Sequence, residues 1–211
     1  MAEWFLPLFP LKLVLFPRTD LALHIFEERY KQMIGECLEH RWEFGIVLVE
    51  ENSIAPVGCT ASITRVVKKY DDGRMDILVR GQRRFEIVHL DQEKPYLRCE
   101  AQFFDDEAAD PPSEDARRQL LDLYSQFVEK LPAGEDSDEK PPEISDPQLS
   151  FQIAGRLPAD LSFRQSLLPL RSESERVRRV TSYLQKMALQ LAAVAQTRAK
   201  AGANGRGRYT A

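Results

Sequence analysis

The feature that most constrains the fold is a series of short β-strand patterns, separated by turn signals, in the first hundred residues. Residues 44–49 form an apolar run of strand length that is rich in branched side chains. Residues 57–70 continue with Thr, Ile and Val and end at residues 71–73, a turn signal whose glycine tolerates a positive φ. Residues 75–79 alternate apolar and polar side chains, as a half-buried strand does. Such a series predicts a small β-barrel or β-sandwich.

Two further features belong to this β region. Gly81 interrupts the alternation before residues 85–87 and 96–104 resume it, which indicates a bulge or a sharp bend at the glycine. One helix is also expected, because apolar residues recur at helical spacing from Phe26 to Leu38. Phe26 and Tyr30 should then lie one turn apart on its buried face.

The second half of the chain reads as helical. Ser113 is a candidate N-cap for a helix that ends at Pro132. Residues 132–147 are rich in proline and acidic side chains and predict a mobile loop. Two shorter helices are expected over residues 148–157 and 161–168.

The last helix has the clearest start signal. Ser172 and Glu175 form a capping box, in which the serine accepts from the N3 amide and the glutamate reaches back to the cap. The apolar seam from Val177 to Val194 is shorter than coiled coils require, so it predicts a helix packed on its own domain, with chain pairing as the alternative. The fold class is therefore α+β: a β domain over 1–106, a helical subdomain over 113–198 and a disordered tail over 199–211.

Composition excludes several classes of function. The 211 residues carry a net charge of −4, too small to indicate a general polyanion binder. No apolar run is long enough to span a bilayer, so no membrane is expected as a partner. The three cysteines, Cys37, Cys59 and Cys99, are widely spaced and predict reduced thiols in a cytoplasmic protein. Cys37 and His40 have C-x-x-H spacing but lack two further ligands, so no metal site is predicted.

No catalytic centre or cofactor site is visible in the sequence. The phosphate-binding loop, the nucleophile elbow and the H-E-x-x-H zinc motif are all absent. One cluster could serve binding instead: Arg80, Arg83 and Arg84 beside the expected bulge, with Arg74 upstream. Arginine suits carboxylate or phosphate ligands, although a charged strand edge that prevents aggregation is the competing interpretation.

Several blocks in order resemble a known family. The segments LPLFPL at 6–11, VLFP at 14–17, LALHIFEERY at 21–30, FGI at 44–46, DGR at 72–74 and GQRRF at 81–85 look like the N-terminal, substrate-recognition domain of Lon proteases. The similarity is greatest to stand-alone bacterial proteins built around that domain. The residues that carry the resemblance are Pro7, Phe9, Pro10, Phe16, Pro17, Phe26, Glu27, Arg29, Tyr30, Gly73, Gly81 and Phe85.

The resemblance implies a PUA-like pseudo-barrel followed by a helical subdomain, and no enzyme, because the ATPase and Ser–Lys peptidase modules of complete Lon proteases are absent. The motif residues are expected to be mainly structural. Pro7, Pro10 and Pro17 suit edge strands and turns, and Arg29 is expected to reach an acid on the barrel.

Three functions follow as hypotheses. The leading one is a non-catalytic module that binds unfolded or extended polypeptide in a barrel groove or at an open strand edge. The second is RNA binding through the Arg80–Arg84 patch, which the net charge and the lack of basic–aromatic alternation disfavour. The third is weak self-assembly through the last helix.

Overall fold

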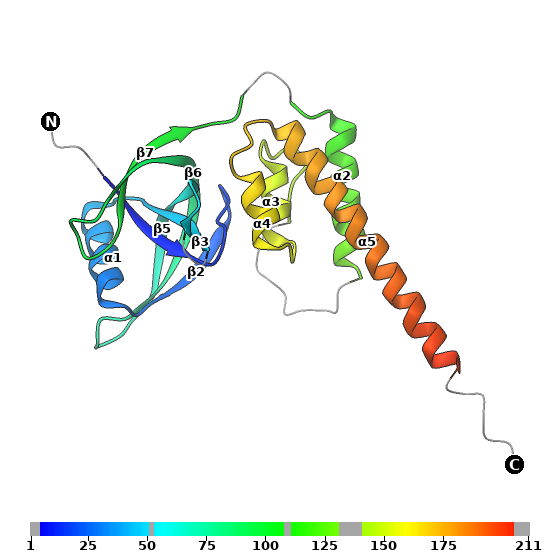
Figure 1. Ribbon diagram of the computed structural model, residues 1–211, viewed down its shortest axis with the longest axis horizontal. Helices are drawn as coiled ribbons and strands as arrows, with labels where there is room; N and C mark the ends of the chain where they lie inside the picture. Colours follow the sequence, from blue (N-terminus) through cyan, green and yellow to red (C-terminus); the bar gives the residue numbers. More distant parts are fainter. Residues whose placement is uncertain (1–4, 51–52, 108–110, 131–140, 205–211) are drawn as a thin grey trace, which may run out of the picture.

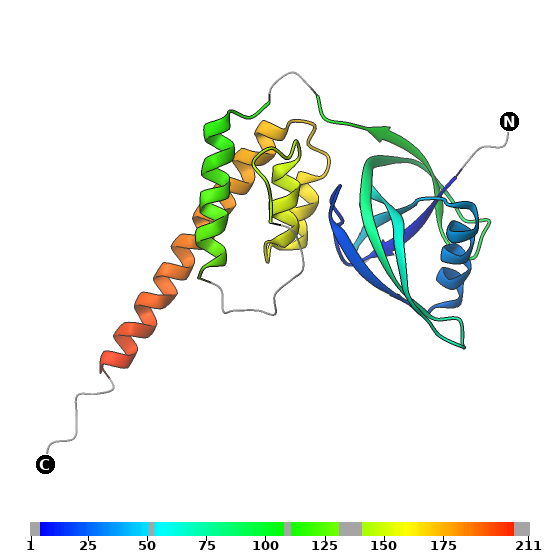
Figure 2. The same cartoon turned by 180° about the vertical axis from the view of Figure 1, so that it is seen from behind.

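The computed structural model describes residues 5–50, 53–107, 111–130 and 141–204. A strand-rich body carries the N-terminal half, and a separate group of helices carries the C-terminal half (Figure 1). The C-terminal part of the last helix projects away from both bodies, as the view from behind also shows (Figure 2). The expected α+β class is confirmed.

Strands lie where the sequence patterns predict them over 44–50, 57–69 and 98–104, a single strand over 75–91 replaces the two expected there, and those at 20–25 and 53–54 were not predicted. The strands are β1 (Leu6–Leu11), β2 (Asp20–Ile25), β3 (Phe44–Glu50), β4 (Ser53–Ile54), β5 (Val57–Lys69), β6 (Met75–Asp91) and β7 (Arg98–Phe104). The helices are α1 (Glu28–His40), α2 (Glu114–Val128), α3 (Leu149–Arg156), α4 (Leu161–Leu167) and α5 (Glu173–Asn204).

The sheet closes into a barrel through β1. This strand pairs antiparallel with β7 on one side and parallel with β3 on the other, so the path β7–β6–β5–β3 returns to its start. The long strand β6 pairs with β5 along one edge. Along its other edge, its first part pairs with β2 and its last part pairs with β7. β2 therefore lies off the closed path and pairs with β6 alone.

The expected irregularity at Gly81 is present. The β5–β6 register passes from Cys59 opposite Arg84 to Ala61 opposite Gly81, which leaves two β6 residues facing one on β5. Gly81 also accepts from the Arg18 amide at 2.7 Å, and a Cβ at Gly81 would lie 2.1 Å from the Phe16 carbonyl oxygen. The predicted turn is confirmed as well, with Gly73 at φ 82°.

Helix α1 covers the barrel core, but it begins later than the sequence predicted. Tyr30, Met33, Ile34 and Cys37 form its buried face, and the Tyr30 ring lies 4.2 Å from that of Phe9 between centroids. The expectation that Phe26 is buried was wrong: its side chain is 59% exposed. Phe26 precedes the first helical turn, so the helical period does not place it on the buried face.

The prolines of β1 also differ from expectation, because β1 is not an edge strand. Pro7 has a partner only on the β7 side and Pro10 only on the β3 side. Each proline therefore has one unpaired side, where a residue without an N–H group is tolerated.

The helical subdomain agrees with the predicted start signals. The Ser113 hydroxyl accepts from the Ala116 amide, and the Ser172 hydroxyl accepts from the Glu175 amide. The second half of the predicted capping box is not formed, since the Glu175 carboxylate pairs with Arg178 and Arg179. Helix α5 continues to Asn204, six residues beyond its expected end at 198. Residues 205–211 of the predicted tail and 131–140 around the predicted loop lie outside the described residues.

The apolar seam of α5 is used within the chain over its first half. Val177, Val180 and Leu184 are buried against α2 and α3, and Met187 packs on the same cluster. The preferred interpretation of a helix packed on its own domain is therefore confirmed for this half. Leu191 is 39% exposed, and the side chain of Val194 lies outside the described residues.

Candidate functional site

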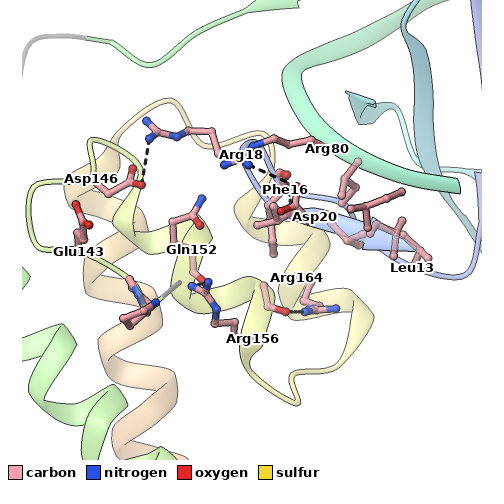
Figure 3. A pocket seen from close by; sticks show the side chains of 18 residues that line it. Leu13, Phe16, Arg18, Asp20, Arg80, Glu143, Asp146, Gln152, Arg156 and Arg164 are labelled. Atoms are coloured by element: carbon pink, nitrogen blue, oxygen red, sulfur yellow. Dashed lines mark hydrogen bonds and ion pairs between the residues drawn. The ribbon is translucent and has the colours of Figure 1, made fainter. Parts of the chain in front are cut away.

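A cavity of about 720 Å³ lies between the barrel and the helical subdomain. Its barrel side comprises residues 13–21 and the middle of β6, and its helical side comprises α3, α4 and the segment 141–146 (Figure 3). Pockets between two packed units are common ligand sites because both units can contribute converging side chains. We take this cavity as the candidate site and call it the junction pocket.

The barrel wall of the junction pocket is held in a strained conformation. Arg18 has a φ of 62°, in the left-handed region that residues other than glycine rarely adopt. The Thr19 hydroxyl donates to the Phe16 carbonyl at 2.7 Å, and Arg18 is anchored to Gly81 by its own amide. A residue stays in such a conformation only when the surrounding structure holds it there.

The helical wall is joined to the barrel wall by aromatic and amide contacts. The Phe16 and Phe151 rings stack with centroids 5.0 Å apart. The Gln165 amide donates to the Val57 carbonyl at 2.9 Å, which fixes α4 against the barrel. Arg164 of α4 donates through Nη2 to the Ala154 and Gly155 carbonyls.

A buried ion network sets the position of the two walls. Arg84 of β6 and Arg176 of α5 are 2% and 0% exposed, and both guanidinium groups bind Asp106. Arg84 also donates to the Leu168 carbonyl at 3.0 Å, and Arg176 pairs with Glu173 at 2.6 Å. These contacts join the barrel, the segment that follows β7 and the start of α5.

Burial shifts the pKa values of the acidic and the basic groups of this network in opposite directions. Burial raises the pKa of Glu173, against the charge of Arg176 and hydrogen bonds from Ser150. Burial likewise lowers the pKa of Arg84, against the charge of Asp106. The network therefore holds charges that depend on one another for their stability.

The predicted arginine patch is not a single surface, and this expectation was wrong. Arg84 is buried in the ion network, and the Arg83 guanidinium lies 4.6 Å from the Phe103 ring centroid. Arg74 pairs with Asp72 at the turn before β6. Arg80 alone among the four lines the junction pocket. The cause is strand alternation together with the bulge, which send neighbouring side chains in different directions.

The open edge of β2 leads into the junction pocket. β2 has no strand partner on its second edge among the residues that the structure describes. The Gly81 amide donates to the Thr19 carbonyl, so the main-chain groups of Thr19 point toward β6. Main-chain groups alternate in direction along a strand, so those of Asp20, Ala22 and His24 point to the second edge. Asp20 and Leu21 also line the pocket.

The other motif residues lie in different environments. Phe85 is fully buried, and Pro17 accepts through its carbonyl from Gln152. Arg29 does not reach an acid on the barrel as expected; it pairs with Glu27 at 2.8 Å and lies 4.6 Å from the Tyr30 ring centroid. The short sequence separation of this pair explains the difference, since the neighbouring carboxylate is within immediate reach.

Cys37, Cys59 and Cys99 are free and buried. Burial raises the pKa of Cys37 and of Cys99 to about 12, with the Glu36 charge adding to the effect at Cys37. Burial also raises the pKa of Cys59. We expect no thiol to react with an aromatic disulfide reagent at pH 8 in the native protein and all three to react in urea. Prompt reaction of a native thiol would contradict the burial of these residues.

Two other kinds of site were sought in the described part of the chain. No group of three or more His, Cys, Asp or Glu side chains is arranged there to hold a metal ion. None of the helices described is both long enough and apolar enough to cross a membrane.

Several residues of the junction pocket and of the buried ion network carried no recognisable signal in the sequence. Arg18 and Arg164 are isolated arginines whose place depends on packing between segments far apart in the chain. Glu173 and Arg176 stand at helical i, i+3 spacing, a signal that could have indicated their pairing but not their burial.

Comparison with known proteins assigns the chain to a family. The sequence matches the family described as the ATP-dependent protease La (LON) substrate-binding domain over residues 5–186. The match covers most of the chain, so this protein belongs to that family. The resemblance found in the sequence is thereby confirmed.

The relatives and solved structures agree with this assignment. Lon protease 2 of Herpetosiphon aurantiacus is 30% identical over 85% of this chain and 23% of its own length, and Lon protease 1 of Bacillus subtilis is 24% identical over 85% and 24%. The chain thus spans about a quarter of these relatives. The crystal structure of a Lon N-terminal domain protein from Xanthomonas campestris has the same fold, with a TM-score of 0.68 at 21% identity over 85% of this chain and 98% of that one.

Proposed function

We propose that this chain binds extended segments of unfolded polypeptide and that the junction pocket, with the β2 edge leading into it, holds them. The open edge of β2 carries this proposal. Main-chain groups on an unpaired strand edge can add an extended peptide as a further strand, whatever its sequence. The adjoining pocket gives room for side chains of such a peptide. Membership in a substrate-binding domain family supports a polypeptide ligand.

We further propose that the chain acts by binding alone, in the cytoplasm. The polar groups that line the described junction pocket are guanidinium, carboxylate, amide and one threonine hydroxyl. That hydroxyl donates to a main-chain carbonyl, so no nucleophile–base pair is formed there. The three free thiols suit a reducing compartment.

The test compares one polypeptide in folded and unfolded form. Fluorescence polarisation should show micromolar binding of labelled, reduced and carboxymethylated α-lactalbumin, and much weaker binding of native α-lactalbumin. Ala22→Pro removes an N–H group from the open edge and should weaken binding about tenfold, since proline blocks strand addition while an edge strand tolerates it. Ala22→Val keeps the N–H group and should bind as the parent does.

Two results would overturn the proposal. Equal affinity for the folded and unfolded forms would show that extended chain is not what is recognised. Unchanged binding by the proline variant would show that the β2 edge is not used.

A further inference from the structure

The junction pocket has a charge pattern that goes beyond a general polypeptide site. Its described lining contains four basic and three acidic side chains. They are Arg18, Arg80, Arg156 and Arg164, together with Asp20, Glu143 and Asp146. A lining with one excess positive charge suits a ligand group with one negative charge better than it suits a polyanion.

Arg164 is the source of that excess. Its Nη2 donates to two main-chain carbonyls, and its buried Nε has no hydrogen-bond partner among the described residues. None of the ion pairs found in the described part of the chain involves Arg164, and burial lowers its pKa, opposed by Tyr183. A desolvated guanidinium whose hydrogen bonds go to neutral carbonyls gains strongly from an anionic partner.

Two further arginines stand at the pocket with loose partners. Arg18 and Asp146 approach to 3.4 Å, and Arg80 and Asp20 to 3.7 Å, with both arginine side chains 48% exposed. Figure 3 shows Arg18 beside Asp146, Arg80 beside Asp20, and Arg164 on the helical side of the pocket. Long, half-exposed ion pairs of this kind contribute little stability, so a guanidinium can exchange its partner for a ligand carboxylate at small cost.

We propose that the junction pocket binds a carboxylate side chain of the extended segment, so that this chain selects segments bearing Asp or Glu. This inference rests on the proposed function and adds the chemical class of the segment. Arg164 receives the carboxylate, and Arg80 and Arg18 guide it from the rim. The guanidinium keeps its positive charge and donates charge-assisted hydrogen bonds to a carboxylate, which provides the selection. Asp20, Glu143 and Asp146 repel a second negative charge and so disfavour nucleic acid.

The experiment uses three labelled twelve-residue peptides that differ only at the central position, which is Glu, Gln or Lys. Fluorescence polarisation at low salt should give about tenfold tighter binding of the Glu peptide than of the Gln peptide, with the Lys peptide weakest. Arg164→Gln should abolish the difference between the affinities for the Glu peptide and the Gln peptide, both measured on this variant. Arg80→Gln, at an exposed position that does not endanger folding, should reduce the difference. Arg83→Gln is the matched control, because Arg83 lies on the same strand outside the pocket.

The outcomes separate this inference from the proposed function. Equal binding of the Glu and Gln peptides by the parent overturns the carboxylate site and leaves polypeptide binding intact. No binding of any peptide overturns the proposed function itself. Displacement of the Glu peptide by a single-stranded RNA oligonucleotide, with the same loss in Arg164→Gln, would show a polyanion site and also overturn the carboxylate assignment.

Discussion

Arg176→Met is expected to lower the free energy of unfolding by about 3–5 kcal/mol, the usual cost of removing one member of a buried ion network. Arg176 is fully buried and binds Asp106, Glu173, Ser150 and the Leu170 carbonyl. Methionine has a similar volume, so the loss reports the unpaired charges and not a cavity. Urea denaturation followed by circular dichroism measures the change.

Arg179→Met is the matched control on the same helix. Arg179 is exposed and pairs with Glu175, so its loss should cost less than about 1 kcal/mol. Similar losses in the two variants would contradict the assigned role of the buried network.

The same variant should change the pH dependence of stability. Burial raises the folded-state pKa of Glu173 above its unfolded value, and Arg176 opposes that rise. A raised carboxyl pKa means that protonation stabilises the fold at low pH and that this contribution is lost as the pH rises through the folded pKa. In Arg176→Met nothing from Arg176 opposes the rise in the pKa of Glu173. The difference in free energy of unfolding between this variant and the parent should therefore become smaller as the pH falls toward the ordinary carboxyl pKa of about 4.3. A gap that widens on acidification would contradict the assignment.

Gly81→Ala is expected to have the second large effect, a loss of about 2–3 kcal/mol, because the added methyl group overlaps main-chain atoms. The new Cβ would lie 2.1 Å from the Phe16 carbonyl oxygen and 3.0 Å from its carbon. Relief requires the segment before β2 to move, which also strains the bond from the Arg18 amide to the Gly81 carbonyl. Thermal unfolding measures the loss, and peptide binding should weaken because this segment forms the barrel wall of the junction pocket.

Gly35→Ala gives the opposite expectation in the same protein. Gly35 lies on the exposed face of α1, with nothing within 4 Å of an added Cβ. Alanine should raise the free energy of unfolding by about 0.5–1 kcal/mol, since glycine is a poor helix former. Destabilisation by both alanines would mean that the loss at Gly81 reflects something other than the close approach of Phe16.

Local patterns were sufficient for most of the elements. The turn at Gly73, the bulge beside Gly81 and the helix starts at Ser113 and Ser172 depend on residues a few positions apart, and each was found where the sequence predicted it. The predictions that were wrong depended on the three-dimensional surroundings of a residue. Phe26 has the spacing of a buried helical residue, yet the helix begins after it. Arg84 has the charge of a surface residue, yet it is buried.

The candidate site was beyond local reasoning for the same reason. Arg84 donates to a carbonyl 84 residues away, and Gln165 donates to one 108 residues away. No periodicity or motif records such pairings, because they arise only when two separately patterned bodies dock. The family motif nevertheless identified the class of protein, since most of its blocks mark the turns and core positions of the barrel.

By itself, then, the order of residues determined the α+β division, most of the strand series, most helix starts and the family, all of which depend on spacing along one segment. Docking of the helices on the barrel decided which arginines are buried and which of them line the junction pocket. The physical reason is that burial converts a guanidinium from a solvated surface charge into a group that must find partners, and those partners come from distant parts of the chain.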